Sequence, residues 1–151
     1  MNKYKLIELF NNSQININVN VNINVNIDEL HDIILHACTK GDKRLLANVL
    51  TFIKNWNIDL DIGYCDGLYG IIAVRSGFIS IIDLLVKHDD AFLKHYGNLM
   101  LKCATETDKT ECVKYLLSKR INPLPLKGKT SWNKYIYKMP LLVDYLSNNN
   151  D

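Results

Sequence analysis

Short runs of apolar residues recur along the chain at helical spacing, and polar turn residues interrupt each run. Between Asp66 and His88, apolar residues gather just before Gly77 and again from Ile81 to Val86. This pattern predicts two short helices joined by a turn at Gly77. A helix of about eight residues is marginal in water, so such a pair must bury its apolar faces against similar neighbouring pairs.

Two related segments are found when the sequence is searched at a period of about 33 residues. Gly41, Gly77 and Asp108 occupy the predicted turns, at separations of 36 and then 31 residues. Four residues before the turns stand Ala37, Ala73 and Ala104, and eight residues after them stand Val49, Leu85 and Leu116. A small side chain at a fixed register lets helices approach closely, which favours a repeat solenoid over an unrelated helical bundle.

The repeated segments resemble the ankyrin-repeat family, whose pattern is roughly GxTPLHLAAxxGHxxIVxLLLxxGADVN. LHACTKGD is similar to the end of the first helix and the turn, SGFISIIDLLVKH to the turn and second helix, and YGNLMLKCA to the beginning of a repeat. RINP and GKTSW resemble the GADP and GKTPL variants, although no copy carries the full TPLH tetrapeptide. The resemblance covers about Leu30 to Ser147. It implies an all-α, ankyrin-type helix-turn-helix solenoid of about three to four repeats.

The resemblance also divides the chain into four segments. Residues 1–14 are expected to hold an N-terminal helix, in which Tyr4 to Phe10 resembles the second helix of a truncated half repeat that caps the stack. Residues 15–27 form a low-complexity tract, residues 28–148 the ankyrin-like repeat domain, and residues 149–151 a frayed tail. A single domain with one core fits a length of 151 residues and a hydrophobic content of 48%.

Ile and Val alternate strictly with Asn from Ile15 to Ile27. This period of two residues favours extended β conformation, a hairpin, or pairing between chains through Asn ladders, and disorder is the competing interpretation. We interpret the tract as an exposed extended insertion in a repeat junction. Self-association through residues 15–27 is an open prediction.

The ends of the helices are predicted from turn and cap residues. Asp28 to Asp32 supplies a cap for the first full repeat, whose second helix runs from about Lys43 to Asn55. Junctions follow at Trp56, with Asp59 in the family's Asp place, and in the glycine-rich stretch from Gly63 to Gly70. The segment from Lys87 to Asn98 carries Ala91 to Leu93 instead of a GADVN junction. A last repeat is expected with helices at Ser131 to Lys138 and from Pro140 to Leu146.

Charge is unevenly distributed although the formal net charge is only +2. Residues 1–93 carry 8 basic and 11 acidic side chains, whereas residues 94–138 carry 10 basic and 3 acidic ones. The later repeats are therefore expected to present a basic surface. The N-terminus lacks a signal-peptide pattern, which predicts an intracellular, soluble and most simply cytoplasmic protein.

No catalytic or cofactor motif is found in the sequence. His31, His36 and Cys38 lack the spacing of a zinc site, and GxSxG and phosphate-binding glycine loops are missing. Cys38, Cys103 and Cys112 are interpreted as small buried hydrophobes, His36 as a residue packed beside the first helix, and His88 and His95 as residues of exposed junctions. We predict no enzyme activity, no cofactor and no metal.

The resemblance implies a protein-protein interaction scaffold that binds through projecting junctions and the exposed, concave side of the first helices. The family's variable positions are Thr39, Lys40, Tyr64, Asp66, Arg75, Ser76, His95, Tyr96, Asn98, Glu106, Thr107, Lys127 and Lys129. Tyr64, Tyr96 and Arg75 are the predicted anchors, because aromatic and Arg side chains dominate interface hot spots. Ordinary solvated surface is the alternative for each of them.

Nucleic-acid binding through the basic repeats is the alternative function. Lys127, Lys129, Lys134 and Lys138 accompany Trp132, Tyr135 and Tyr137, and such a mixture suits phosphate contacts with base stacking. The same aromatic residues fall where a capping helix needs core residues, which is the simpler interpretation. Salt-dependent retention on a nucleic-acid column separates the two.

Overall fold

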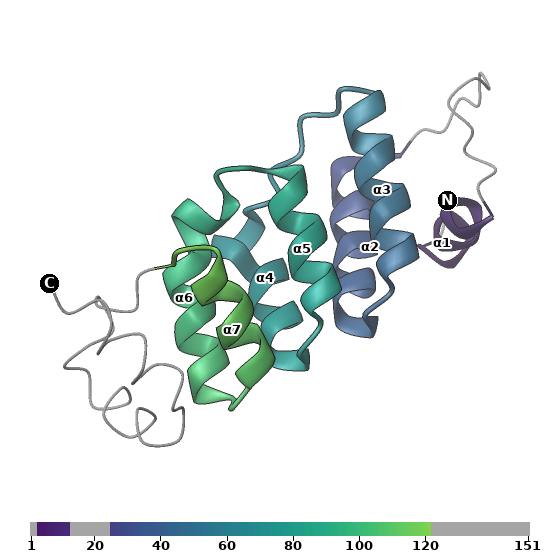
Figure 1. The fold of residues 1–151 in the computed structure, drawn as a ribbon. Helices are drawn as coiled ribbons and strands as arrows, with labels where there is room; N and C mark the ends of the chain where they lie inside the picture. Colours follow the sequence, from purple (N-terminus) through teal and green to yellow (C-terminus); the bar gives the residue numbers. More distant parts are fainter. Residues whose placement is uncertain (1–2, 13–24, 122–151) are drawn as a thin grey trace, which may run out of the picture.

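The computed structural model describes residues 3–12 and 25–121. Within these residues it contains seven α-helices and no strand, which confirms the all-α prediction (Figure 1). The helices are α1 (Lys3–Asn11), α2 (Ile27–Lys40), α3 (Lys43–Asn55), α4 (Tyr64–Ser76), α5 (Ile79–His88), α6 (Phe92–Glu106) and α7 (Thr110–Ser118). The expected helices between residues 131 and 146 lie outside the described residues.

Three helix pairs stack side by side to form two layers. The first helices α2, α4 and α6 pack on one another, and the second helices α3, α5 and α7 form the layer that faces the viewer in Figure 1. Apolar residues of both layers make one continuous core. This arrangement is the helix-turn-helix solenoid predicted from the repeated alanines and turns.

The turns inside the three pairs share one geometry. Gly41, Gly77 and Asp108 are all left-handed, with φ of 69°, 75° and 55°. In each pair the residue after the turn donates its backbone N–H to the carbonyl oxygen of the alanine four positions before the turn, at 2.9 Å. Those alanines, Ala37, Ala73 and Ala104, are fully buried, as are Val49, Leu85 and Leu116. The predicted register of the repeats is therefore confirmed.

Helix α1 closes one end of the stack. It packs against both α2 and α3 and buries Leu6 and Phe10. The amide Nδ2 of Asn48 in α3 donates a hydrogen bond of 2.7 Å to the carbonyl oxygen of Phe10. A helix thus covers the core at this end, and its assignment as a half repeat stays a prediction.

The beginning of α2 corrects the predicted boundary of the alternating tract. Asn26 is the N-cap: its side chain accepts from the backbone N–H of Glu29, and Glu29 accepts in return from the backbone of Asn26. This capping box satisfies N–H groups that the first helical turn leaves free. Asn26 and Ile27 therefore belong to the helix, where Asp28 to Asp32 was predicted to supply the cap. Residues 15–24 of the tract lie outside the described residues.

The connections between pairs also differ from the expected hairpins. Helix α6 begins at Phe92, separated from the end of α5 by only three residues, because Ala91 is its N-cap and Phe92 and Leu93 form its first turn instead of a junction. The stretch expected as a junction from Gly63 to Gly70 mostly forms the beginning of α4, and of its three glycines only Gly67 has positive φ. Two connections keep the left-handed residue where the family has glycine, at Asn57 and Arg120.

Candidate protein-binding surface

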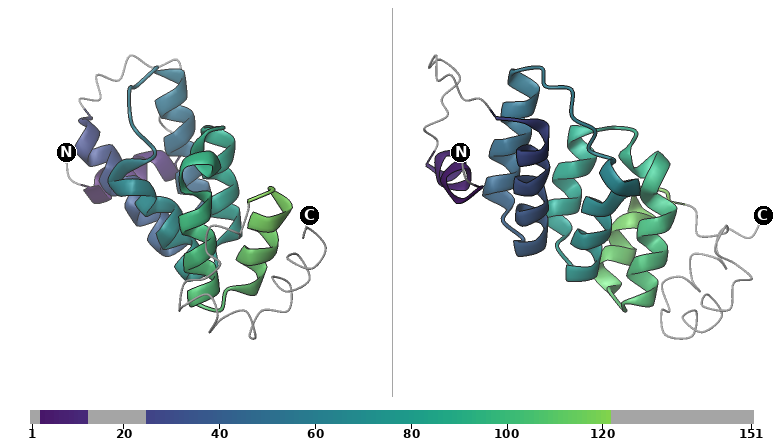
Figure 2. Two further views of the ribbon diagram at one scale, coloured as in Figure 1. Left: turned by 90° about the vertical axis from the view of Figure 1, so that its left-hand side faces the viewer. Right: turned by 180° about the vertical axis from the view of Figure 1, so that it is seen from behind.

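Most residues predicted to contact a partner lie on α4 and α6, two of the first helices that stack with α2 (Figure 2, right). Those exposed to solvent are Thr39, Lys40, Tyr64, Asp66, Arg75, Ser76, His95, Asn98 and Glu106, whereas Tyr96 and Thr107 are half-buried. Lys127 and Lys129 lie outside the described residues. The structure therefore brings the predicted residues of α4 and α6 onto one layer of the stack.

A stack of three rings joins the beginning of α4 to α2. The ring of Tyr64 lies 4.1 Å from that of His31, centroid to centroid, with an interplanar angle of 26°. Below them the Nδ1 atom of His31 is hydrogen-bonded to the hydroxyl of Tyr69, which is fully buried. Tyr64 itself is 43% exposed. The stack thus holds one face of an aromatic ring rigidly at the surface.

A left-handed bend presents Tyr64 in this position. Cys65, Asp66 and Gly67 have φ of 50°, 56° and 83°, so the first turn of α4 departs from helical geometry. Before the bend, a carboxylate oxygen of Asp61 accepts the backbone N–H of Gly63 at 2.8 Å. Residues other than glycine rarely adopt these backbone angles. The two consecutive non-glycine residues Cys65 and Asp66 therefore hold the backbone beside Tyr64 in an unfavourable conformation.

The charges of three carboxylates act on His31 in this stack. Burial lowers the pKa of His31, and the charges of Asp28, Asp61 and Asp32 act in the opposite direction. Among the described residues these three carboxylates form no ion pair. The imidazole is neutral near pH 7 because burial outweighs the carboxylates, and the exposed ring of Tyr64 lies in a negative field.

Tyr96 occupies a different place from the one predicted. It lies inside α6, not at a projecting junction, and its hydroxyl donates a hydrogen bond of 3.3 Å to the carbonyl oxygen of Gly63. A Cβ atom added to Gly67 would stand 2.7 Å from Cγ of Tyr96, so the ring fills the space that glycine leaves. Tyr96 is thus a packing residue between α4 and α6, since the short connection before α6 carries its ring against α4.

Arg75 is exposed at the end of α4, as predicted, but it does not adjoin Tyr96. Burial raises the pKa of Cys103, and the nearby Arg75 guanidinium offsets part of this rise. Cys103 follows Tyr96 by seven residues in α6, about 10 Å along the helix axis. Arg75 and Tyr96 therefore lie toward opposite ends of the two helices and do not form a joint anchor.

Several other predictions concern single residues of this region. His95 is exposed within α6 and not in a junction, and His88 ends α5 half-buried. His36 is half-buried, whereas Cys38, Cys103 and Cys112 are buried as predicted. Sequence reasoning missed Leu99, which is 46% exposed on α6. An apolar residue inside a helical pattern is ordinarily assigned to the core, so no local signal distinguishes it.

Comparison with protein-family models supplies the family. The model of ankyrin repeats in three copies matches residues 34–125, more than half of the chain. The chain belongs to the ankyrin-repeat family. Comparison with curated proteins and with solved structures gives no match. The matched residues contain the second half of α2 and the whole of α3 to α7, so the helix pairs of the structure are its ankyrin repeats.

Ankyrin repeats are generally modules for protein-protein interaction and typically lack catalysis. In the part of the chain that the structure describes, no group of three or more His, Cys, Asp and Glu side chains is arranged to hold a metal ion. The imidazole of His31 contacts Tyr64 and Tyr69 instead. None of the helices within residues 3–12 and 25–121 has the length and hydropathy of a membrane-crossing segment.

Proposed function

We propose that the protein is a non-catalytic scaffold that binds a partner protein through the exposed side of its first helices. The observation that carries this proposal is the surface ring of Tyr64, which is held by stacking on buried His31. A fixed, partly exposed aromatic ring offers contact area at little cost in conformational entropy, as interface hot spots do. Leu99 on α6 adds a second exposed apolar side chain to this layer.

Arg75 is the second anchor of the proposed surface. It is exposed in the last turn of α4, and its guanidinium lowers the pKa of Cys103 in α6, which indicates that the two side chains are close. Ser76 and Glu106 are exposed close to the same ends of the two helices. Tyr96 contributes through the fold instead, because its ring supports the bend that presents Tyr64.

Affinity capture followed by mass spectrometry tests the proposal. The bait proteins are the wild type, the double variant Tyr64→Ala with Arg75→Ala, and the control Lys114→Ala, whose side chain is exposed on α7 in the other layer. Proteins captured by the wild type and the control are expected to be lost from the double variant. An anchor that contributes about 2 kcal/mol accounts for roughly thirtyfold in the dissociation constant, so the loss of both anchors would raise it by several hundredfold or more if their contributions add.

Circular dichroism and melting temperature show that each bait is folded. Retention of every captured protein by a well-folded double variant contradicts the proposed surface. Nucleic acid is tested in parallel on a nucleic-acid column, where binding through phosphates weakens steeply as salt rises. Retention that disappears with salt would favour the alternative function assigned to the basic repeats.

A further inference from the structure

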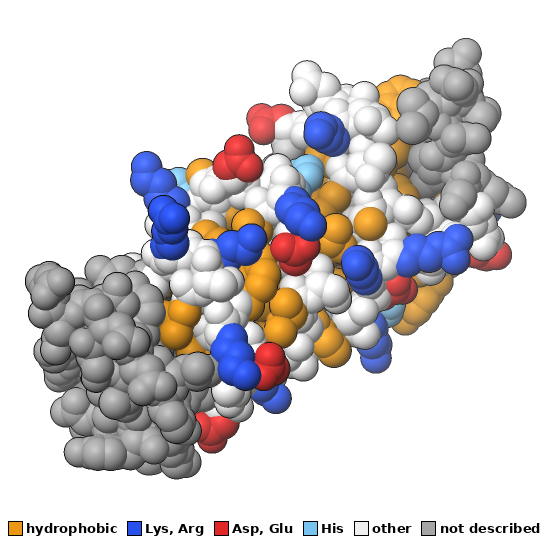
Figure 3. Space-filling model, in the orientation of Figure 1, with side chains coloured by type: hydrophobic (Ala, Val, Ile, Leu, Met, Phe, Trp, Pro, Cys, Tyr) orange, Lys and Arg blue, Asp and Glu red, His pale blue; other side chains and the backbone are white. Residues whose placement is uncertain are grey.

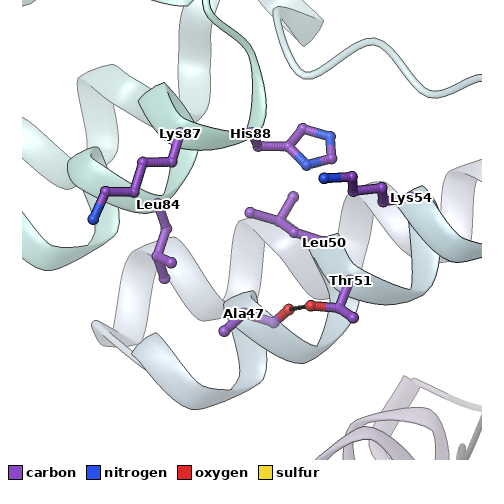
Figure 4. A pocket seen from close by; sticks show the side chains of 7 residues that line it. All are labelled: Ala47, Leu50, Thr51, Lys54, Leu84, Lys87 and His88. Atoms are coloured by element: carbon purple, nitrogen blue, oxygen red, sulfur yellow. Dashed lines mark hydrogen bonds between the residues drawn. The ribbon is translucent and has the colours of Figure 1, made fainter.

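A shallow groove lies on the opposite layer of the stack, between the second helices α3 and α5 (Figure 4). Its volume is about 170 Å³. The apolar side chains of Ala47, Leu50 and Leu84 form its floor, and Lys54, Lys87 and His88 line its rim. The residues of α3 in this set are spaced by three and four positions, so they share one side of that helix.

The floor of the groove is incompletely covered. Leu50 is only 5% exposed, whereas Ala47 and Leu84 are half-buried, and Leu84 packs against the core. Orange apolar side chains are visible between blue Lys and Arg side chains on this face of the molecule (Figure 3). An apolar cavity of about 150 Å³ is large enough for benzene, so a groove of this size suits one branched or aromatic side chain.

The rim of the groove is cationic and incompletely neutralised. Among the described residues Lys54 forms no ion pair, whereas Lys87 pairs with Asp83 at 2.7 Å. Helix α3 contributes Lys54 to the rim and contains no acidic residue. An occupant that brings carboxylates to this rim is therefore favoured electrostatically.

His88 strengthens the same preference. Burial lowers its pKa, the charge of Lys54 lowers it further, and Asp89 acts in the opposite direction. A carboxylate placed between Lys54 and His88 would compensate the ammonium and favour the protonated imidazole. Binding of an acidic occupant should then become tighter as the pH falls below 6.5, the ordinary pKa of histidine.

We propose that this groove is a second protein-binding site, which receives an apolar side chain from an acidic segment of a partner. The apolar side chain lies on Leu50 and Leu84, and flanking carboxylates face Lys54, Lys87 and His88. Among the described residues that line the groove there is no Phe, Tyr or Trp, so it lacks the large aromatic platform on which bases of single-stranded nucleic acid stack. The site lies on the layer opposite Tyr64, so both surfaces can be occupied together.

Selection of random twelve-residue peptides displayed on phage tests this site. Peptides are selected on the wild type and then measured against Lys54→Glu, Leu84→Asp, Tyr64→Ala and the control Lys114→Glu. The control changes an exposed lysine of the same layer outside the groove. We expect enrichment of peptides with an apolar residue between Asp or Glu residues. Both groove variants should weaken such peptides at least tenfold, while the control should change their binding little.

Three results of the peptide measurements would overturn the proposal. They are selected peptides without acidic and apolar enrichment, equal binding to all folded variants, and loss of binding only in Tyr64→Ala, which would place the peptides on the first-helix surface. Lys54→Glu leaves the apolar floor intact, so it remains informative if Leu84→Asp fails to fold. Groove-dependent binding to phosphatidylserine vesicles would assign a membrane instead, and groove-dependent dimers in solution would assign a second copy of the chain.

Discussion

At the residue scale, the position of the Tyr96 ring requires that residue 67 has no side chain. Gly67 has a left-handed backbone, and the ring of Tyr96 lies in the space where a Cβ atom would stand. Gly77 is also left-handed, but a Cβ atom added there would lie 3.8 Å from its nearest neighbour, Cδ of Lys109. Alanine at Gly77 would therefore introduce backbone strain alone, whereas alanine at Gly67 would introduce the same strain and a clash with Tyr96.

We expect Gly67→Ala to destabilise the fold more than Gly77→Ala. Backbone strain alone costs about 1–2 kcal/mol at a left-handed position, and only Gly67 adds a clash. In a Tyr96→Ala background the cost of Gly67→Ala should decrease, whereas that of Gly77→Ala should not. Urea unfolding of the single and double variants measures this coupling. Additive costs for Gly67 and Tyr96 would show that the ring does not require glycine.

The buried imidazole of His31 predicts a pH-dependent stability. Burial lowers the pKa of His31 in the folded state below its unfolded value of about 6.5, as it does for His36 and His88. Below that pH the unfolded chain binds protons that the folded chain resists, so the free energy of unfolding should fall from pH 7 to pH 5. His31→Gln should reduce this fall.

Urea titrations at pH 7 and pH 5 check this expectation. Asp83 contributes little to the change in stability between these two pH values. Its pKa is lowered in the folded state, so its contribution to stability is lost mainly below about pH 4. Equal stability of the wild type at both values would contradict it. An unchanged pH dependence in His31→Gln would assign the effect to the other two histidines.

At the scale of the element, each helix pair depends on a small residue four positions before its turn. Ala73 is fully buried in α4, and its carbonyl oxygen accepts the N–H of Phe78 after the turn. We expect Ala73→Leu to cost about 1–3 kcal/mol of stability, because close packing leaves no room for the added atoms. The control is Ser76→Ala at an exposed position of the same helix. Equal melting temperatures for the two variants would refute the packing role of the alanine.

At the scale of the whole molecule, the alternating tract is expected to affect association rather than folding. Ser in place of Ile15, Ile17, Val19, Val21 and Ile23 keeps the length of the connection and removes the apolar face. The helical stack should keep its melting temperature, while self-association measured by sedimentation should decrease if the tract acts as an unpaired strand edge. A large loss of stability would instead make the tract part of the core.

The helix pairs themselves were predictable from the sequence alone. Gly41, Gly77, Asp108 and the alanines before them recur at one register, and local turn chemistry together with helical spacing determines both the pairs and their stacking. The end of the alternating tract was misplaced because Asn alternates along the sequence there and Asn26 also caps α2.

Tertiary structure decided which residues form surfaces. Tyr96 and Tyr64 are equally plausible anchors in the sequence, but the short connection before α6 carries Tyr96 against Gly67, while the bend in α4 leaves Tyr64 on His31. The groove of Leu50, Leu84 and Lys54 joins residues of two repeats that no local pattern connects. Periodicity determines what each helix buries within its own repeat, whereas exposure depends on how neighbouring repeats meet.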